Sequence, residues 1–90
     1  MKIERVVVGD LGENCYVLGI DNEVLIVDPG DEYEKINKVI GGRNVLGILI
    51  THNHFDHVGA LKYFKDTNVY SFENLKEKEY VIGNFKFNVI

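Results

Sequence analysis

Short apolar runs alternate with polar turns along the whole chain, a pattern typical of strands joined by tight connections. Three strands are predicted at residues 2–8, 14–20 and 23–28. Asp21 and Asn22 form a hairpin turn between the second and the third. Residues 25–27 are consecutive apolar residues, so we expect the third strand to be covered on both faces.

A sharp turn follows at residues 28–31, because Pro29 lacks a backbone donor and Gly30 tolerates positive φ. The remaining pattern predicts a helix at 34–40, a strand at 45–51, a second helix at 58–65, and strands at 69–72, 79–82 and 85–90. This order predicts an α/β fold, a mixed β-sheet with two helices in a single domain spanning residues 1–90. The last strand ends on apolar residues, which favours another strand beside it.

Composition narrows the class of protein. Hydrophobic residues make up 46% of the chain, which is typical of a globular domain. The net charge of −4 argues against a nucleic-acid partner, and no apolar run is long enough to cross a membrane. The first residues lack a signal-peptide pattern, so a cytoplasmic location is expected. Cys15 is the only cysteine and is predicted to be a small buried strand residue.

All three histidines fall within residues 51–59, which read Thr-His-Asn-His-Phe-Asp-His-Val-Gly. Imidazole nitrogens and carboxylate oxygens are the ligands that zinc and similar divalent metals prefer. Alternate side chains of an extended segment point the same way, so His52 and His54 can converge on one ion. Asp56 and His57 lie where the chain turns toward the second helix and face a neighbouring point. The alternative is three histidines with ordinary hydrogen bonds, which this spacing disfavours.

Thr51–Gly59 resembles the Thr-His-x-His-x-Asp-His-x-Gly signature of the metallo-β-lactamase superfamily. Two further elements match in order: Asn-Cys-Tyr at residues 14–16 and Ile-Val-Asp-Pro-Gly at residues 26–30. The Asn-Cys-Tyr element is most similar to the glyoxalase II-like, or hydroxyacylglutathione hydrolase-like, branch. The resemblance implies the N-terminal half of a metallo-β-lactamase-type αββα sandwich.

The resemblance also implies roles for individual residues. His52 and His54 would bind a first metal, and Asp56 and His57 would bind or orient at a second. Asp56 would also act in catalysis by orienting the attacking water. Asp28 would support the site from beneath, the alternative being a turn residue before Pro29. The implied cofactor is one or two Zn²⁺ ions, with iron or manganese also compatible.

The expected reaction is metal-assisted hydrolysis of an ester, thioester or related bond in a small-molecule substrate. The chain has no further histidine to complete the family's ligand set. Three hypotheses therefore stand beside one another. The chain is part of a hydrolase whose C-terminal half pairs at the last strand, or two copies associate as a homodimer, or the chain is a non-catalytic metal-binding module. Measurement of metal content and oligomeric state separates these hypotheses.

Overall fold

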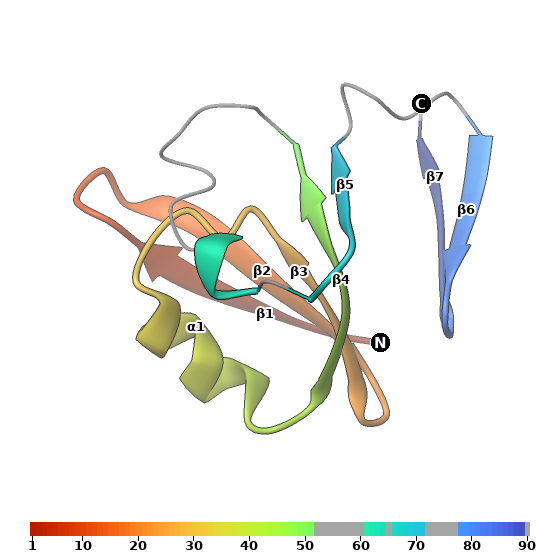
Figure 1. Cartoon of the computed structure of the whole chain (residues 1–90), viewed down its shortest axis with the longest axis horizontal. Coiled ribbons are helices and arrows are strands. Elements are labelled where there is room, and N and C mark those ends of the chain that lie inside the picture. The colour runs from red at the N-terminus through yellow and green to blue at the C-terminus, as the bar shows by residue number, and fades with distance from the viewer. Residues whose placement is uncertain (52–60, 65, 72–77, 90) are drawn as a thin grey trace.

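A computed structural model describes residues 1–51, 61–64, 66–71 and 78–89 (Figure 1). Its elements, in chain order, are β1 (Lys2–Val8), β2 (Glu13–Ile20), β3 (Glu23–Val27), α1 (Tyr33–Ile40), β4 (Asn44–Ile50), a 3-10 turn (Leu61–Tyr63), β5 (Val69–Ser71), β6 (Lys78–Ile82) and β7 (Phe85–Val89). The predicted α/β fold is confirmed, and each described strand begins and ends within a residue of its predicted bounds.

The second predicted helix, at residues 58–65, is described in part. Leu61–Tyr63 form a 3-10 turn rather than an α-helix, and residues 58–60 and 65 lie outside the described residues. Among the described residues α1 is therefore the one α-helix. None of the helical segments described in the structure is long and apolar enough to cross a bilayer.

The main sheet has five strands in the order β1-β2-β3-β4-β5. The first three strands pair antiparallel, whereas β3–β4 and β4–β5 pair parallel. Because β3 and β4 are parallel, both strands end at the same edge of the sheet. The connections that follow them, beginning at Asp28 and Thr51, therefore emerge side by side.

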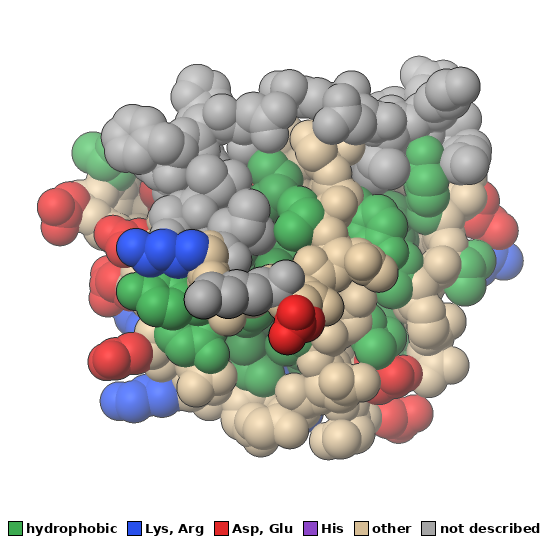
Figure 2. All heavy atoms as spheres, viewed as in Figure 1, with side chains coloured by type: hydrophobic (Ala, Val, Ile, Leu, Met, Phe, Trp, Pro, Cys, Tyr) green, Lys and Arg blue, Asp and Glu red, His purple; other side chains and the backbone are tan. Residues whose placement is uncertain are grey.

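Apolar clusters lie on both faces of the sheet, as the consecutive apolar residues of β3 predict. On one face, Val24 and Ile26 pack in a cluster that includes Ile36 and Ile40 of α1. On the other face, Leu25 packs with Phe85 from the β6–β7 hairpin. The layers are thus helix, sheet and hairpin (Figure 1). In the space-filling view, most charged side chains lie around the margin and apolar side chains show through the centre (Figure 2).

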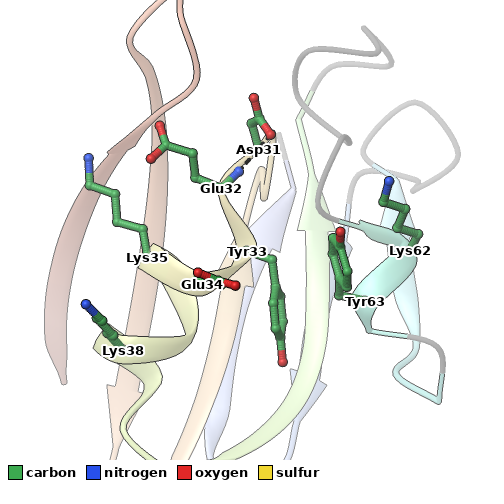
Figure 3. Close-up of a pocket in the computed structure, with 8 residues that line it drawn as sticks. All are labelled: Asp31, Glu32, Tyr33, Glu34, Lys35, Lys38, Lys62 and Tyr63. Carbon is green, nitrogen blue, oxygen red and sulfur yellow. Dashed lines mark hydrogen bonds between the residues drawn. The ribbon is translucent and has the colours of Figure 1, made fainter.

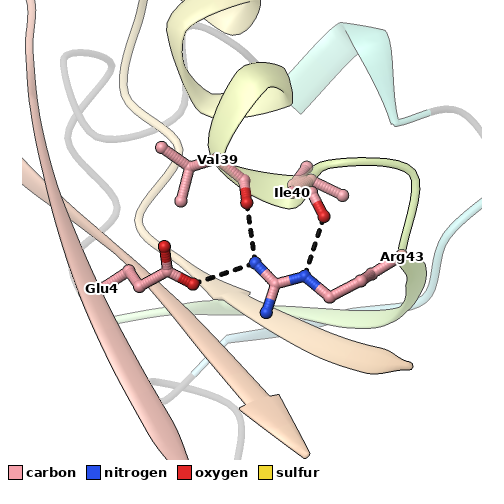
Figure 4. A network of polar contacts seen from close by, with 4 residues as sticks. All are labelled: Glu4, Val39, Ile40 and Arg43. Carbon is pink, nitrogen blue, oxygen red and sulfur yellow. Dashed lines mark hydrogen bonds and ion pairs between the residues drawn. The ribbon is translucent and has the colours of Figure 1, made fainter. Parts of the chain in front are cut away.

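Arg43 joins the end of α1 to the edge strand β1 (Figure 4). Its Nε donates to the carbonyl oxygen of Ile40 at 2.8 Å, and its Nη2 donates to that of Val39 at 2.7 Å. The same Nη2 lies 2.9 Å from Oε1 of Glu4. A cation at a helix C-terminus is favourable because carbonyl groups there lack intrahelical partners. Arg43 therefore stabilises the end of α1 and fixes it against the sheet.

Candidate metal centre

The candidate site lies at the sheet edge where β3 and β4 end. In sheets with parallel strands, ligands commonly bind beyond the carboxyl ends of the strands. The predicted ligands His52, His54, Asp56 and His57 follow β4 directly but lie outside the described residues. The structure therefore describes the support of this segment, which is the set of residues that hold the chain immediately before it. The ligand roles of the four residues remain predictions.

Asp28 is the residue of this support with the clearest geometry. It follows β3, is 7% exposed, and has a left-handed φ of 52°. Its Oδ1 accepts a hydrogen bond from the backbone N–H of Thr51 at 2.8 Å, and its Oδ2 accepts one from the Thr51 hydroxyl. Asp28 thus holds the residue immediately before His52. Its position agrees with the predicted supporting role, which itself remains a prediction.

The local backbone explains why Asp28 takes this position. Its N–H donates to the carbonyl oxygen of Leu49 in β4 at 2.9 Å, which extends the β3–β4 pairing by one step. Its own carbonyl oxygen accepts from the N–H of Gly30 at 2.8 Å, closing the turn around Pro29. A non-glycine residue at positive φ costs about 1–3 kcal/mol and is often found at functional sites. The two hydrogen bonds from Thr51 help to hold this conformation.

Cys15 is a buried neighbour of this support and not a nucleophile. It is fully buried in β2, as predicted, and burial raises the pKa of its thiol to about 12, with a smaller contribution from the charge of Asp28. A thiol with such a pKa stays neutral at physiological pH and is a poor nucleophile and metal ligand. Hydrolytic chemistry at this edge therefore has to come from other groups.

The residues present fit a cation at this edge. Asp28 is a buried carboxylate, and within the described part of the chain no Lys or Arg forms an ion pair with it. A buried charge without an opposite charge is costly, so a nearby cation is favourable. Residues 1–51, 61–64, 66–71 and 78–89 contain no group of three His, Cys, Asp or Glu side chains that could hold a metal. The donors therefore have to include residues of the histidine-rich segment.

An open pocket of about 530 Å³ lies between the start of α1 and the 3-10 turn (Figure 3). Its lining residues are Asp31–Lys35, Lys38, Lys62 and Tyr63. Three carboxylates and three ammonium groups line it, so its charge does not select an anion or a cation. One wall of the pocket is formed by the rings of Tyr33 and Tyr63, which stack with centroids 4.7 Å apart.

Three contacts around this edge could not be predicted from the sequence. Thr51 was recognised as part of a motif, but not as the partner of Asp28. Glu32 has a left-handed φ of 50°, and its Oε1 accepts from the N–H of Gly9 at 2.8 Å. Tyr33, the residue before the predicted helix at 34–40, stacks on Tyr63. Only the position of Thr51 next to His52 offered a signal, because the residues of the other two contacts lie outside the sequence motifs.

Comparison with known proteins agrees with this geometry. A family model of the metallo-beta-lactamase superfamily matches residues 8–88, and the chain belongs to that superfamily. The superfamily predicted from the sequence motif is thereby confirmed. Membership of this superfamily implies binding of a divalent metal. The matches to hydrolases show that the family is hydrolase-like.

Three similar proteins illustrate the relationship. The probable metallo-hydrolase YqgX of Bacillus subtilis (strain 168) is 46% identical over 81 residues, covering 84% of this chain and 38% of the relative. The hydroxyacylglutathione hydrolase GloC of Haemophilus influenzae is 37% identical over 68 residues, covering 72% of this chain and 32% of the relative. The crystal structure of the BLEG-1 B3 metallo-beta-lactamase superposes with a TM-score of 0.86 at 25% identity, covering 97% of this chain and 59% of that one. The chain thus spans 38% of the length of YqgX and 32% of the length of GloC.

Proposed function

We propose that the chain forms the N-terminal, metal-binding part of a hydrolase that cleaves an ester, thioester or related bond in a small-molecule substrate. The observation that carries the proposal is the contact between Asp28 and Thr51 at the edge where two parallel strands end. This contact fixes the chain immediately before the motif that contains His52, His54, Asp56 and His57. A hydroxyacylglutathione-type thioester is the favoured substrate, because GloC carries that name.

Each residue of the candidate site has a separate proposed role. His52 and His54 would hold one divalent ion, and Asp56 and His57 a second, with zinc the favoured metal for an imidazole-rich donor set. When bound, the metal supplies Lewis-acid polarisation of the scissile bond and lowers the pKa of water toward neutrality. Asp56 would accept a hydrogen bond from the attacking water and orient it. Asp28 keeps the start of the ligand segment in place through Thr51.

Metal binding is tested on the purified chain by elemental analysis and native mass spectrometry, before and after chelation. We expect bound zinc that is lost in His54→Ala and retained in Asn53→Ala, the matched variant that changes the residue between the two histidines. Equal metal content in the two variants would contradict the assigned ligands. A wild-type chain that takes up no zinc, iron or manganese when reconstituted would contradict the proposal as a whole.

A second candidate function is metal binding without hydrolysis. It needs only the predicted ligands His52, His54, Asp56 and His57, without an attacking water oriented by Asp56. The two candidates are separated by assaying hydrolysis of a hydroxyacylglutathione thioester by the zinc-loaded chain. Turnover that is abolished by Asp56→Asn supports the hydrolase, whereas stoichiometric zinc without turnover supports the binding module.

A further inference from the structure

The segment from Asp28 to Tyr33 contacts residues on both sides of the histidine-rich segment 52–60. At one end, Asp28 accepts two hydrogen bonds from Thr51. At the other end, the ring of Tyr33 stacks on Tyr63, with centroids 4.7 Å apart and planes inclined by 24°. It also meets Phe64 edge to face, at 5.2 Å and 70°. One short connection thus touches the residue before the nine-residue segment and residues that follow it.

Tyr33 lies at the start of α1, a helix that is packed firmly against the sheet. It is the first residue of α1, whose side chains Ile36 and Ile40 are 0% and 3% exposed against the sheet. Next to it, Glu32 accepts from the N–H of Gly9, and the Lys35 ammonium donates to the carbonyl oxygen of Val7 at 2.5 Å. The start of α1 is therefore attached to the end of β1 on one side, and Tyr33 projects toward Tyr63 on the other (Figure 3).

The Tyr33 contacts differ in burial. Phe64 is 8% exposed and belongs to the core cluster, against which Tyr33 also packs. Tyr63 is 54% exposed, so the core alone does not hold it in place. An aromatic pair contributes about 0.5–1.5 kcal/mol beyond the area that it buries. The stack on Tyr33 therefore helps to order the exposed side of the 3-10 turn, where the Lys62 ammonium also lies 5.3 Å from the centroid of the Tyr63 ring.

We propose that Tyr33 is a positioning residue for the metal ligands: its ring holds Tyr63 and Phe64 and so fixes the far end of the segment whose near end is fixed by Asp28. The inference rests on the proposed metal-binding function. A segment with both ends fixed has fewer conformations to lose when its side chains converge on an ion. Loss of groups that orient metal ligands typically weakens metal affinity by about 10- to 100-fold.

A merely structural role for Tyr33 would lower the stability of the fold without a specific effect on metal affinity. The chain offers a matched control, because Tyr80 and Phe87 of the β6–β7 hairpin also stack, with centroids 5.7 Å apart and planes inclined by 18°. Tyr80→Leu removes an aromatic stack of the same kind from a hairpin on the opposite face of the sheet. Tyr33→Phe retains the ring and serves as the conservative variant.

The test combines zinc titration against a competing chelator with hydrogen exchange of the metal-free proteins. We expect Tyr33→Leu to weaken zinc affinity about tenfold and to speed amide exchange in the peptide covering residues 52–60. Tyr63→Leu should act in the same way, and it removes the stack from the exposed side if Tyr33→Leu does not fold. Tyr33→Phe and Tyr80→Leu should stay within about twofold of the wild type.

The outcomes are distinguishable. Unchanged zinc affinity and unchanged exchange in Tyr33→Leu and Tyr63→Leu would overturn the inference and leave the proposed function intact. Equal losses in Tyr33→Leu and Tyr80→Leu would also overturn it, because the effect would then be one of general stability. If the wild-type chain binds no zinc, iron or manganese, the proposed function fails, and the exchange comparison alone decides whether Tyr33 orders the segment.

Discussion

Replacing Thr51 by valine tests the contact that supports the candidate site. Valine keeps the shape of threonine but removes the hydroxyl that donates to Oδ2 of Asp28. The backbone N–H of Thr51 still donates to Oδ1 at 2.8 Å, so half of the contact survives. Because Asp28 is only 7% exposed, solvent replaces the lost donor poorly.

The magnitude follows from this geometry. A hydrogen bond to a charged group contributes about 1.5–3 kcal/mol, so Thr51→Val should lower the free energy of unfolding by about 2 kcal/mol. In a domain of this size, 1 kcal/mol shifts Tm by about 4–8 °C, so the expected fall in Tm is about 8–16 °C. Thr51→Ser, which keeps the hydroxyl, should lose less than about 1 kcal/mol.

Urea unfolding of the two variants measures the difference. A double-mutant cycle that combines Thr51→Val with Asp28→Asn isolates the pair from any other interaction of Thr51, and its coupling energy should exceed about 1 kcal/mol. If Thr51→Val and Thr51→Ser unfold at the same urea concentration, or if the cycle gives additive effects, the hydroxyl does not stabilise Asp28 and the reasoning is refuted.

Three further predictions concern the same support and the packing behind it. Asp28→Asn should weaken zinc affinity about 10- to 100-fold, measured by chelator competition, and an unchanged affinity would separate Asp28 from the metal site. Since the pKa of Cys15 is raised from 9.0 to about 12, its contribution to stability is present below pH 9 and lost as pH rises from there. Urea unfolding should show the wild type losing about 2 kcal/mol more than Cys15→Ala between pH 9 and 10.5, and parallel pH profiles would contradict this. A Cβ at Gly19 would lie 2.6 Å from Nη1 of Arg43, so Gly19→Ala should destabilise the wild type by about 1 kcal/mol in thermal unfolding but not the Arg43→Ala background.

Much of the fold could be predicted because its signals are local. Strand β3 shows this, since its consecutive apolar residues already indicate two covered faces, and Val24 and Leu25 indeed pack on opposite sides of the sheet. The end of α1 could also be predicted from the sequence. Gly41 takes a left-handed φ of 60° and its N–H donates to the carbonyl oxygen of Asn37, as a glycine at a helix C-terminus is expected to do.

The resemblance implied a supporting role for Asp28, but its contact with Thr51 could not be predicted, because the contact depends on register. Asp28 meets Thr51 only when Val27 lies opposite Leu49 in the parallel pair, and a parallel register is not encoded by a turn of fixed length. The left-handed conformation of Glu32 has no local signal, since glutamate rarely adopts it. The second helix was overpredicted at Leu61–Tyr63, where helical spacing is present but the described turn is 3-10.

The topology explains why one connection can support another. Strands β3 and β4 are parallel, so the connection after β3 and the segment after β4 leave the sheet at the same edge, while residues 41–43 return at the opposite edge. Asp28 and Tyr33 belong to the first connection, and both contact residues that flank the candidate ligands. Arg43 belongs to the opposite edge and contacts Glu4 and the end of α1 instead. Substitutions that lower stability equally should therefore affect metal affinity at residues 28–33 and leave it unchanged at residues 41–43, because only the first connection contacts residues that flank the candidate ligands.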